Sequence, residues 1–427
     1  MKSSKTLSLS LYVEKFVPGG EALASFADRL LPDGSENPYY GKKVFLWNAL
    51  PGEKVKKFQV LKEKSSYLEA VALEIDSPSL RRVAPKDACF LSTSPWQILD
   101  WDYELEQKRE LIKESLSQAH LELPDGVEVE PVKTDGTEWS YRNKMEYSLY
   151  WDNAEEKIFL AFHNRGSHAK IPLKPSSSPS DASSGNPASS SLERKEIAEK
   201  AFKIVEELNS AHASARDFQS LLLRSSQSGV VSGGLFENKK PHPTFENLSD
   251  TLLGHEYSYS PNGFFQINLP VYELALKEIK KAVDASPNLK VLDLYAGVGT
   301  IGLSVAPSRD LTLVECNKDA FRELKNNAKD WQGINPVFTK SEDALDYIAP
   351  DEIVILDPPR AGCDKKLIDR LLEACPKKII YLSCNPSTQA RDVALLTIEG
   401  RYKISRILPF NFFPKTPHIE NLIILEL

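Results

Sequence analysis

The sequence predicts a multidomain α/β protein with a small N-terminal β-barrel, a central α+β region and a C-terminal doubly wound parallel sheet. Three observations support this fold class. The chain has 427 residues, more than one compact core usually holds. Its first part alternates apolar and polar residues between Pro/Gly turns, which indicates short half-buried strands. Its last part alternates apolar strands with helices, which indicates a parallel sheet covered on both faces.

The N-terminal barrel is expected from residue 8 to about residue 86. Within it, the stretch from Lys42 to Lys64 contains seven lysines and two glutamates, a local excess of five positive charges. Three aromatic residues are interleaved with them: Phe45, Trp47 and Phe58. The stretch fits a solvated sheet face. On this stretch alone the solvated face is the better interpretation, but in an acidic protein a basic barrel with interleaved aromatic residues suits RNA, because lysines bind phosphates and aromatic rings stack on bases.

The middle of the chain mixes helices and strands. An acidic first turn and apolar positions at helical spacing predict one amphipathic helix from Asp100 to about Ala119. Beyond it we expect strands at 144–150, 158–162 and 220–224 and a helix at 192–208. Residues 175–191 are almost wholly Ser, Pro, Ala, Gly, Asn and Asp, so we expect a disordered surface insert there.

From about residue 288 the pattern is strand, loop, helix, repeated. Strands are expected at 290–294, 311–314, 353–356 and 378–382, and helices from 301 and at 318–329, 365–374 and 388–396. Sheets of this kind bind ligands beyond the carboxyl ends of their strands. We therefore expect the chemistry-bearing residues of this region at such ends.

A glycine-rich loop, Gly297-Val298-Gly299-Thr300-Ile301-Gly302, follows the first of these strands. The loop also fits a nicotinamide-dependent dehydrogenase, with Glu315 as the ribose-binding acid. Asp293, at the strand end, would repel a pyrophosphate but attract a cationic sulfonium with an amino-acid tail. The rigid turn Asp357-Pro358-Pro359-Arg360 has no evident use in a dehydrogenase. These residues favour S-adenosylmethionine as the ligand.

Two further residues form a candidate catalytic pair. Cys384 follows the apolar run Ile379–Leu382, and Glu420 precedes the terminal apolar run. Alone, such a cysteine is usually a small buried hydrophobe and such a glutamate a surface charge. Beside the glycine loop and Asp357 they match the needs of pyrimidine C5 methylation. A thiolate adds to carbon 6 to make carbon 5 nucleophilic, and a base then removes the carbon 5 proton.

These motifs resemble the RNA 5-methyluridine methyltransferase family over nearly the whole chain. The segment Asn48–Glu53 resembles its TRAM (OB-like) RNA-binding barrel, Tyr141–Lys144 its central-domain motif, and Asn262–Asn268 the start of its Rossmann-like catalytic domain. The resemblance implies that Cys384 is the nucleophile and Glu420 the proton acceptor. It implies cofactor contacts for S-adenosyl-L-methionine at Gln266, Tyr295, Thr300, Glu315, Asp343 and Asp357.

The sequence departs from this family at its cysteines. Several TRAM-containing members hold an iron–sulfur cluster with four cysteines, three of them just after the barrel. Here the segment Pro85–Trp96 keeps only Cys89, and the region after Phe162-His163 has none. One thiol cannot ligate such a cluster. We expect no iron–sulfur cluster, no other metal, and five reduced cysteines, since no C-x-x-C pair is present.

The predicted domains are a TRAM-like barrel at 1–86, an RNA-binding domain at 119–250, and a methyltransferase domain formed by 95–118 with 251–427. We expect an enzyme acting on structured RNA, ribosomal RNA before a tRNA T-loop. The dehydrogenase and a non-catalytic RNA-binding homologue remain as alternatives. The net charge of −7 argues against an unstructured nucleic-acid binder. No apolar run approaches the ~18 residues of a membrane span, and no signal-peptide pattern is present, so we expect a cytoplasmic monomer without membrane contact.

Overall fold

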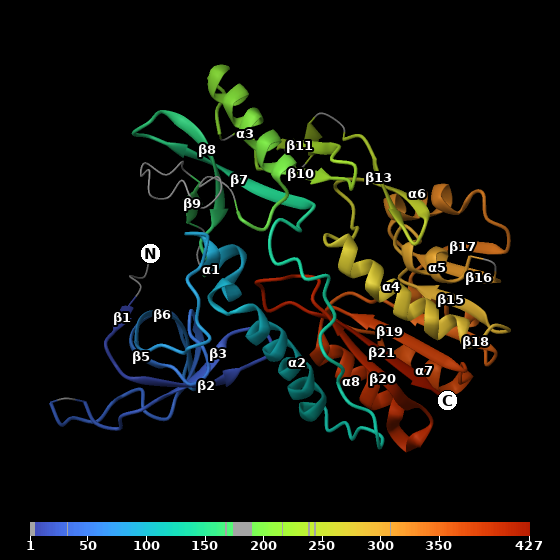
Figure 1. The fold of residues 1–427 in the computed structure, drawn as a ribbon, viewed down its shortest axis with the longest axis horizontal. Helices are drawn as coiled ribbons and strands as arrows, with labels where there is room; N and C mark the ends of the chain where they lie inside the picture. Colours follow the sequence, from blue (N-terminus) through green and yellow to red (C-terminus); the bar gives the residue numbers. More distant parts are fainter. Residues whose placement is uncertain are drawn as a thin grey trace. The chain divides into compact units, whose positions relative to one another are not determined.

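The computed structural model describes two compact units (Figure 1). Unit 1 contains the chain up to Glu114 together with 162–171 and 415–418. Unit 2 contains 115–161, 172–414 and 419–427. The described residues are 5–31, 33–166, 169–173, 190–215, 217–237, 240–242, 245–307 and 309–427. The predicted insert at 175–191 lies outside them except for Ser190 and Ser191.

Unit 1 is built on a closed β-barrel, as the sequence predicts. Its strands are β1 (Lys5–Leu7), β2 (Leu11–Phe16), β3 (Ala22–Phe26), β4 (Lys43–Trp47), β5 (Lys54–Glu63) and β6 (Tyr67–Ser77). The order β5-β2-β3-β4-β6 closes because β6 also pairs with β5. Leu11, Val13 and Val55 alternate with exposed neighbours and are fully buried in the barrel. The period of two therefore sets the inside and outside of the barrel.

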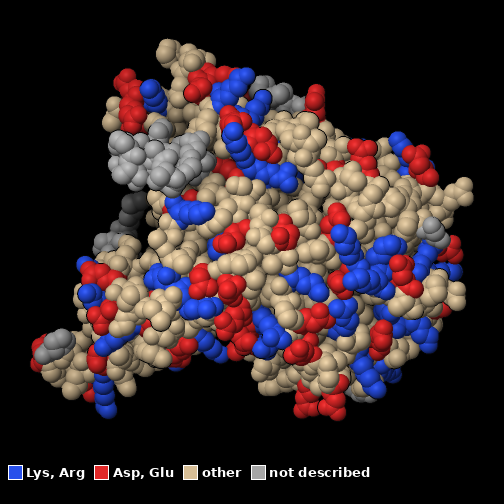
Figure 2. Space-filling view, viewed as in Figure 1, with Lys and Arg blue, Asp and Glu red and all other residues tan. Residues whose placement is uncertain are grey.

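The lysine-rich stretch of the barrel differs from the expected basic, aromatic surface. Phe58 is buried inside the barrel, where its place on β5 turns it inward. Trp47 is buried on the other face of β4, where the guanidinium of Arg165 lies 4.0 Å from the centroid of its ring. Most of the lysines also pair with glutamates of the barrel: Lys42 pairs with Glu63, Lys43 with Glu14, Lys56 and Lys57 with Glu74, and Lys62 with Glu69. The local charge excess is thus offset across the sheet, and basic and acidic side chains are also interspersed in Figure 2.

After the barrel come α1 (Phe90–Thr93), the 3₁₀ turn η1 (Pro95–Ile98) and α2 (Trp101–Gln118). The predicted amphipathic helix is confirmed. Asp100 Oδ1 accepts the Tyr103 N–H at 2.8 Å at its start, as the expected Asp cap requires. The boundary between the two units falls inside α2, between Glu114 and Ser115. The three-domain division stays a prediction.

The first part of unit 2 holds an antiparallel sheet and a hairpin. The sheet contains β7 (Lys144–Asp152), β8 (Lys157–His163), β10 (Ser220–Ser225), β11 (Val231–Glu237) and β12 (Lys240–His242), and α3 (Lys195–Ser210) packs on β10 and β11. The end of β8 and most of β9 (Lys170–Pro172) belong to unit 1. β13 (Leu248–Leu252) and β14 (His255–Tyr259) form the hairpin.

The second part of unit 2 is a seven-stranded sheet in the order β17-β16-β15-β18-β19-β21-β20. Its strands are β15 (Lys290–Leu294), β16 (Leu311–Glu315), β17 (Ile334–Phe338), β18 (Glu352–Leu356), β19 (Lys378–Ser383), β20 (Lys403–Phe410) and β21 (Glu420–Glu426). The helices are α4 (Leu269–Asp284), α5 (Thr300–Val305), α6 (Lys318–Ala328), α7 (Lys365–Ala374) and α8 (Pro386–Thr397). The predicted strands and helices after residue 288 are confirmed.

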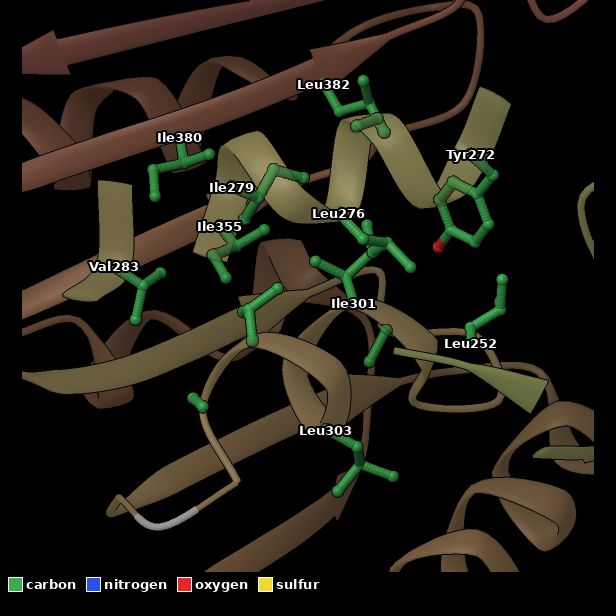
Figure 3. Packing of buried hydrophobic residues seen from close by; sticks show 14 of the residues in the cluster. Leu252, Tyr272, Leu276, Ile279, Val283, Ile301, Leu303, Ile355, Ile380 and Leu382 are labelled. Carbon is green, nitrogen blue, oxygen red and sulfur yellow. The ribbon is translucent and has the colours of Figure 1, made fainter. Parts of the chain in front are cut away.

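The core of this sheet is continuous with α4 (Figure 3). Leu276 and Ile279 of α4 belong to one buried cluster with Ile301, Ile355 and Ile380. Each of these side chains is at most 5% exposed, and burying one such side chain is worth about 1.5–3 kcal/mol. In the described part of the chain, no helix is both long and apolar enough to cross a membrane.

Candidate active site

Most of the predicted site residues gather at one edge of the seven-stranded sheet. β15, β18 and β19 are parallel neighbours, so their carboxyl ends lie together. Tyr295 directly follows β15, Asp357 follows β18, and Cys384 follows β19. The parallel topology places these three residues side by side, as the sequence predicts.

Glu420 reaches the same edge by a different route. It is the first residue of β21, which runs antiparallel to β19, so the expectation that every site residue lies at a carboxyl end is wrong for Glu420. In the register of the two strands Ser383 pairs with Asn421. This pairing places the amino end of β21 beside the carboxyl end of β19. Cys384 and Glu420 are therefore neighbours across the two strands.

The electrostatics of this pair disfavour negative charge. Burial raises the pKa of the Cys384 thiol to about 11, and the nearby Glu420 and Asp357 carboxyl groups raise it further. Burial and Asp357 together raise the pKa of Glu420 well above its usual range. The guanidinium of Arg360 opposes these effects, because it is hydrogen-bonded to Cys384 and attracts Glu420. The thiol is thus protonated at neutral pH.

The turn that carries Arg360 is fixed to the start of α8. The Arg360 carbonyl accepts hydrogen bonds from Asn385 Nδ2 at 2.8 Å and Thr388 Oγ1 at 3.1 Å. Gly362 has φ +81°, and a Cβ there would lie 2.6 Å from Asp392 Oδ2, so the turn approaches α8 too closely for a side chain. Arg360 stands in the quoted motif but received no role from the sequence. The sequence could have pointed to Arg360, because it is the one cationic residue in the turn that contains Asp357.

Asp293 has a different environment from the one the sequence suggested. It is fully buried, and its Oδ2 accepts the Gly302 N–H at 2.8 Å. Burial raises the pKa of Asp293 to about 8. A Cβ at Gly302 would lie 2.5 Å from Leu313, so the glycine permits this close approach. Asp293 therefore anchors the end of the glycine loop through a buried hydrogen bond and does not present an exposed charge.

Glu315 lies directly across the glycine loop. Its Oε2 accepts the Gly297 N–H at 2.8 Å, and its Oε1 accepts the Asn317 N–H. A Cβ at Gly297 would meet nothing within 4 Å, so the space over the loop is open. Thr300 begins α5 at the end of the loop and is 6% exposed. These groups together form a cradle at the mouth of β15.

The two remaining predicted contacts lie on other segments. Gln266 is 6% exposed and lies in the segment between β14 and α4. Its backbone carbonyl accepts hydrogen bonds from the side chains of Arg224 and Asn143. Asp343 is exposed at the end of η3 (Ser341–Asp343), after β17. Among the described contacts, none ties Asp343 directly to the other predicted residues.

In the segment Pro85–Trp96, where we expect no iron–sulfur cluster, the side-chain amide of Gln97 connects several residues by hydrogen bonds. Gln97 Oε1 accepts the backbone N–H groups of Lys86 and Asp87, and its Nε2 donates to Asp87 Oδ2 at 2.7 Å and to Ser94 Oγ at 2.6 Å. Cys89 belongs to the same segment of the chain and is buried. Over the residues described, no group of three or more His, Cys, Asp or Glu side chains is arranged to bind a metal ion. The absence of an iron–sulfur cluster stays a prediction.

Comparisons with known proteins place this fold and site in context. The sequence pattern of the family described as tRNA (Uracil-5-)-methyltransferase matches residues 338–427. An uncharacterized RNA methyltransferase of Lactobacillus johnsonii is 30% identical over 447 residues, covering 90% of this chain and 94% of the relative. Another from Enterococcus faecalis is 29% identical over 429 residues, covering 90% of this chain and 92% of that one.

A solved structure shares the fold. The Pyrococcus abyssi tRNA (uracil-54, C5)-methyltransferase, in complex with S-adenosyl-L-homocysteine, superposes with a TM-score of 0.68 at 22% identity, covering 97% of this chain and 99% of that one. The chain belongs to the family of uracil-5 RNA methyltransferases. The resemblance seen in the sequence is thereby confirmed, and the protein is an RNA methyltransferase.

Proposed function

We propose that this enzyme transfers a methyl group from S-adenosyl-L-methionine to carbon 5 of a uridine in structured RNA. One observation carries the proposal. The antiparallel register of β19 and β21 places a thiol, Cys384, and a buried carboxyl group, Glu420, together at the sheet edge that also bears the glycine loop. Covalent activation of a pyrimidine needs both groups in one site.

The residues at the glycine loop fit the methyl donor. The space over Gly297 is open, and Asp293 Oδ1 is buried without a hydrogen-bond partner among the described residues. Glu315 would hold the ribose hydroxyls, since its carboxylate already accepts hydrogen bonds at the loop. Tyr295, Thr300, Gln266, Asp343 and Asp357 would complete the contacts. The bound donor supplies an electrophilic methyl group on a sulfonium.

The protein residues would act in a fixed order. The Cys384 thiol releases its proton to solvent, and the thiolate adds to carbon 6 of the uracil, so the electron pair of the C5–C6 double bond moves toward the carbon 4 carbonyl as an enolate. Carbon 5 then forms its bond to the methyl group, and the donor leaves as a neutral thioether. Glu420 removes the carbon 5 proton, the double bond re-forms, and Cys384 leaves as a thiolate.

The buried carboxyl groups suit this order. Once Glu420 has lost its proton, its raised pKa makes the carboxylate a stronger base than that of an exposed glutamate. Arg360 offsets the repulsion that Glu420 and Asp357 exert on the thiolate. The uridine would have to be taken out of the RNA stack to reach Cys384, which is the usual requirement for chemistry on a nucleobase.

The RNA substrate follows from weaker observations. The closed N-terminal barrel suits ribosomal RNA, which is our first candidate for the substrate. We propose residues 119–250 as a second RNA-binding region and residues 95–118 with 251–427 as the catalytic part. A tRNA T-loop uridine is the second candidate, because the solved structure of the same fold is described as a tRNA (uracil-54, C5)-methyltransferase. We propose that the enzyme works as a cytoplasmic monomer.

Two substitutions test the proposal. Cys384→Ala should abolish both methyl transfer and any covalent RNA adduct, whereas Glu420→Gln should accumulate a methylated enzyme–RNA adduct that survives denaturing electrophoresis. Labelled methyl donor with unmodified ribosomal RNA and unmodified tRNA, followed by mapping of the product, identifies the target. More than a trace of activity in Cys384→Ala would show that the covalent route is wrong. Binding of a nicotinamide cofactor in place of the methyl donor would favour a dehydrogenase.

A further inference from the structure

A fully buried arginine holds the segment that carries Gln266. Arg224 lies on β10, outside the seven-stranded sheet, and is 0% exposed. Its Nη1 donates to the Gly263 carbonyl at 3.3 Å, and its Nη2 donates to the Phe265 carbonyl and, at 3.0 Å, to the Gln266 carbonyl. One side chain therefore collects three carbonyl oxygens of a four-residue segment.

The surroundings of the guanidinium show why it is kept there. Taking an arginine out of water costs several kcal/mol unless its donors are satisfied and its charge is offset. The ring of Tyr259 lies 4.9 Å from the guanidinium and that of Phe265 lies 5.5 Å from it, so both supply cation–π attraction. Burial lowers the pKa of Arg224 to about 10, so it keeps its charge at neutral pH. The charge then faces the carbonyl dipoles.

Converging carbonyl groups repel each other when no cation lies between them. The segment 263–266 therefore depends on Arg224 for its conformation. Asn143 reinforces the arrangement, because its Nδ2 donates to the Gln266 carbonyl at 3.2 Å and its backbone N–H donates to the Ile267 carbonyl. Lys144 holds the start of the segment through the Asn262 and Gly263 carbonyls. Both donors to Gln266 come from the central sheet region.

We propose that Arg224 is a positioning residue, which acts through the Gln266 backbone to hold the Gln266 side chain in place for the methyl donor. This inference rests on the proposed function in taking S-adenosylmethionine as the ligand and Gln266 as one of its contacts. The carbonyl oxygen of Gln266 receives two donors, so its backbone is fixed and its side chain, 6% exposed, has little freedom. A lysine in place of Arg224 keeps the charge but loses the forked donors that reach separate carbonyls.

The test is a double-mutant cycle on S-adenosylmethionine binding measured by calorimetry. Arg224→Lys should weaken binding about tenfold, and the same change in a Gln266→Ala background should weaken it less than twofold further. Asn143→Ala should give a smaller loss of the same kind, and it serves in place of Arg224→Lys if that variant does not fold. Arg194→Lys is the matched control, because Arg194 donates to the Ser226 carbonyl, outside this segment.

The outcomes separate the alternatives. If Arg224→Lys weakens S-adenosylmethionine binding equally in the wild-type and Gln266→Ala backgrounds, Arg224 only supports the fold. Unchanged affinity for S-adenosylmethionine in Arg224→Lys would also overturn the proposal. A loss in Arg194→Lys equal to that in Arg224→Lys would do the same. Because the readout needs no RNA, failure of uridine methylation with an intact cycle would refute the proposed function and leave this inference standing.

Discussion

Removal of Arg360 should slow the reaction of Cys384 with alkylating agents. Burial and two nearby carboxyl groups raise the pKa of this thiol to about 11, and the Arg360 guanidinium is the cation that opposes them. At pH 8 a thiol with that pKa is ionised in roughly one molecule in a thousand. The thiolate that does form depends on its hydrogen bond to Arg360.

The magnitude follows from the exposure of the arginine. A hydrogen bond to a charged group is worth about 1.5–3 kcal/mol when buried, and solvent reduces this at an exposed group. Arg360 is exposed, so we take about 1.4 kcal/mol as the upper bound, which corresponds to about tenfold. Arg360→Ala should therefore lower the alkylation rate of Cys384 by three- to tenfold at every pH from 7 to 10, and Arg360→Lys should lower it less.

The assay is timed labelling with iodoacetamide followed by mass spectrometry of the digested protein. The exposed thiol of Cys316 provides an internal reference in the same molecule. Arg401→Ala is the matched control, because Arg401 Nη1 lies 3.7 Å from the sulfur of another thiol, Cys375. If the ratio of Cys384 to Cys316 labelling is the same in wild type and Arg360→Ala, Arg360 does not stabilise the thiolate.

Three further predictions concern other parts of the chain. The pKa of Asp293 is raised from 3.8 to about 8 in the fold, so its protonated form is favoured there and stability is lost as pH rises from about 4 to 8. Asp293→Asn should therefore gain stability relative to wild type by up to about 1.4 kcal/mol per pH unit in that window, measured by urea unfolding, and a pH-independent difference would contradict this. Charge reversal of Lys54, Lys56 and Lys57 should weaken binding of long structured RNA and lower the salt slope by up to ~0.9 per lost contact, although Lys56 and Lys57 already pair with Glu74. An unchanged slope would mean that these lysines do not contact phosphates. Anaerobically purified protein should contain no iron, and stoichiometric iron would show that the cluster ligands were misread.

The sequence by itself determined the local elements of the catalytic fold and supplied the candidates for its reactive groups. Apolar runs at 290–294 and 378–382 gave strands at those positions, since burial on both faces requires such runs. The glycine loop, the turn at Asp357 and the residues Cys384 and Glu420 were all identified without the structure. Each is a local pattern, readable in a few consecutive residues.

The tertiary structure alone decided how these groups face each other. The direction of β21 depends on its long-range pairing with β19, and its apolar run reads the same for either direction. That pairing, and not the pattern, brings Glu420 to Cys384. The carbonyl partners of Arg224 likewise come from a distant segment, so its burial could not be predicted from neighbouring residues. Local periodicity fixes which residues are buried, whereas only the packed chain fixes what surrounds them.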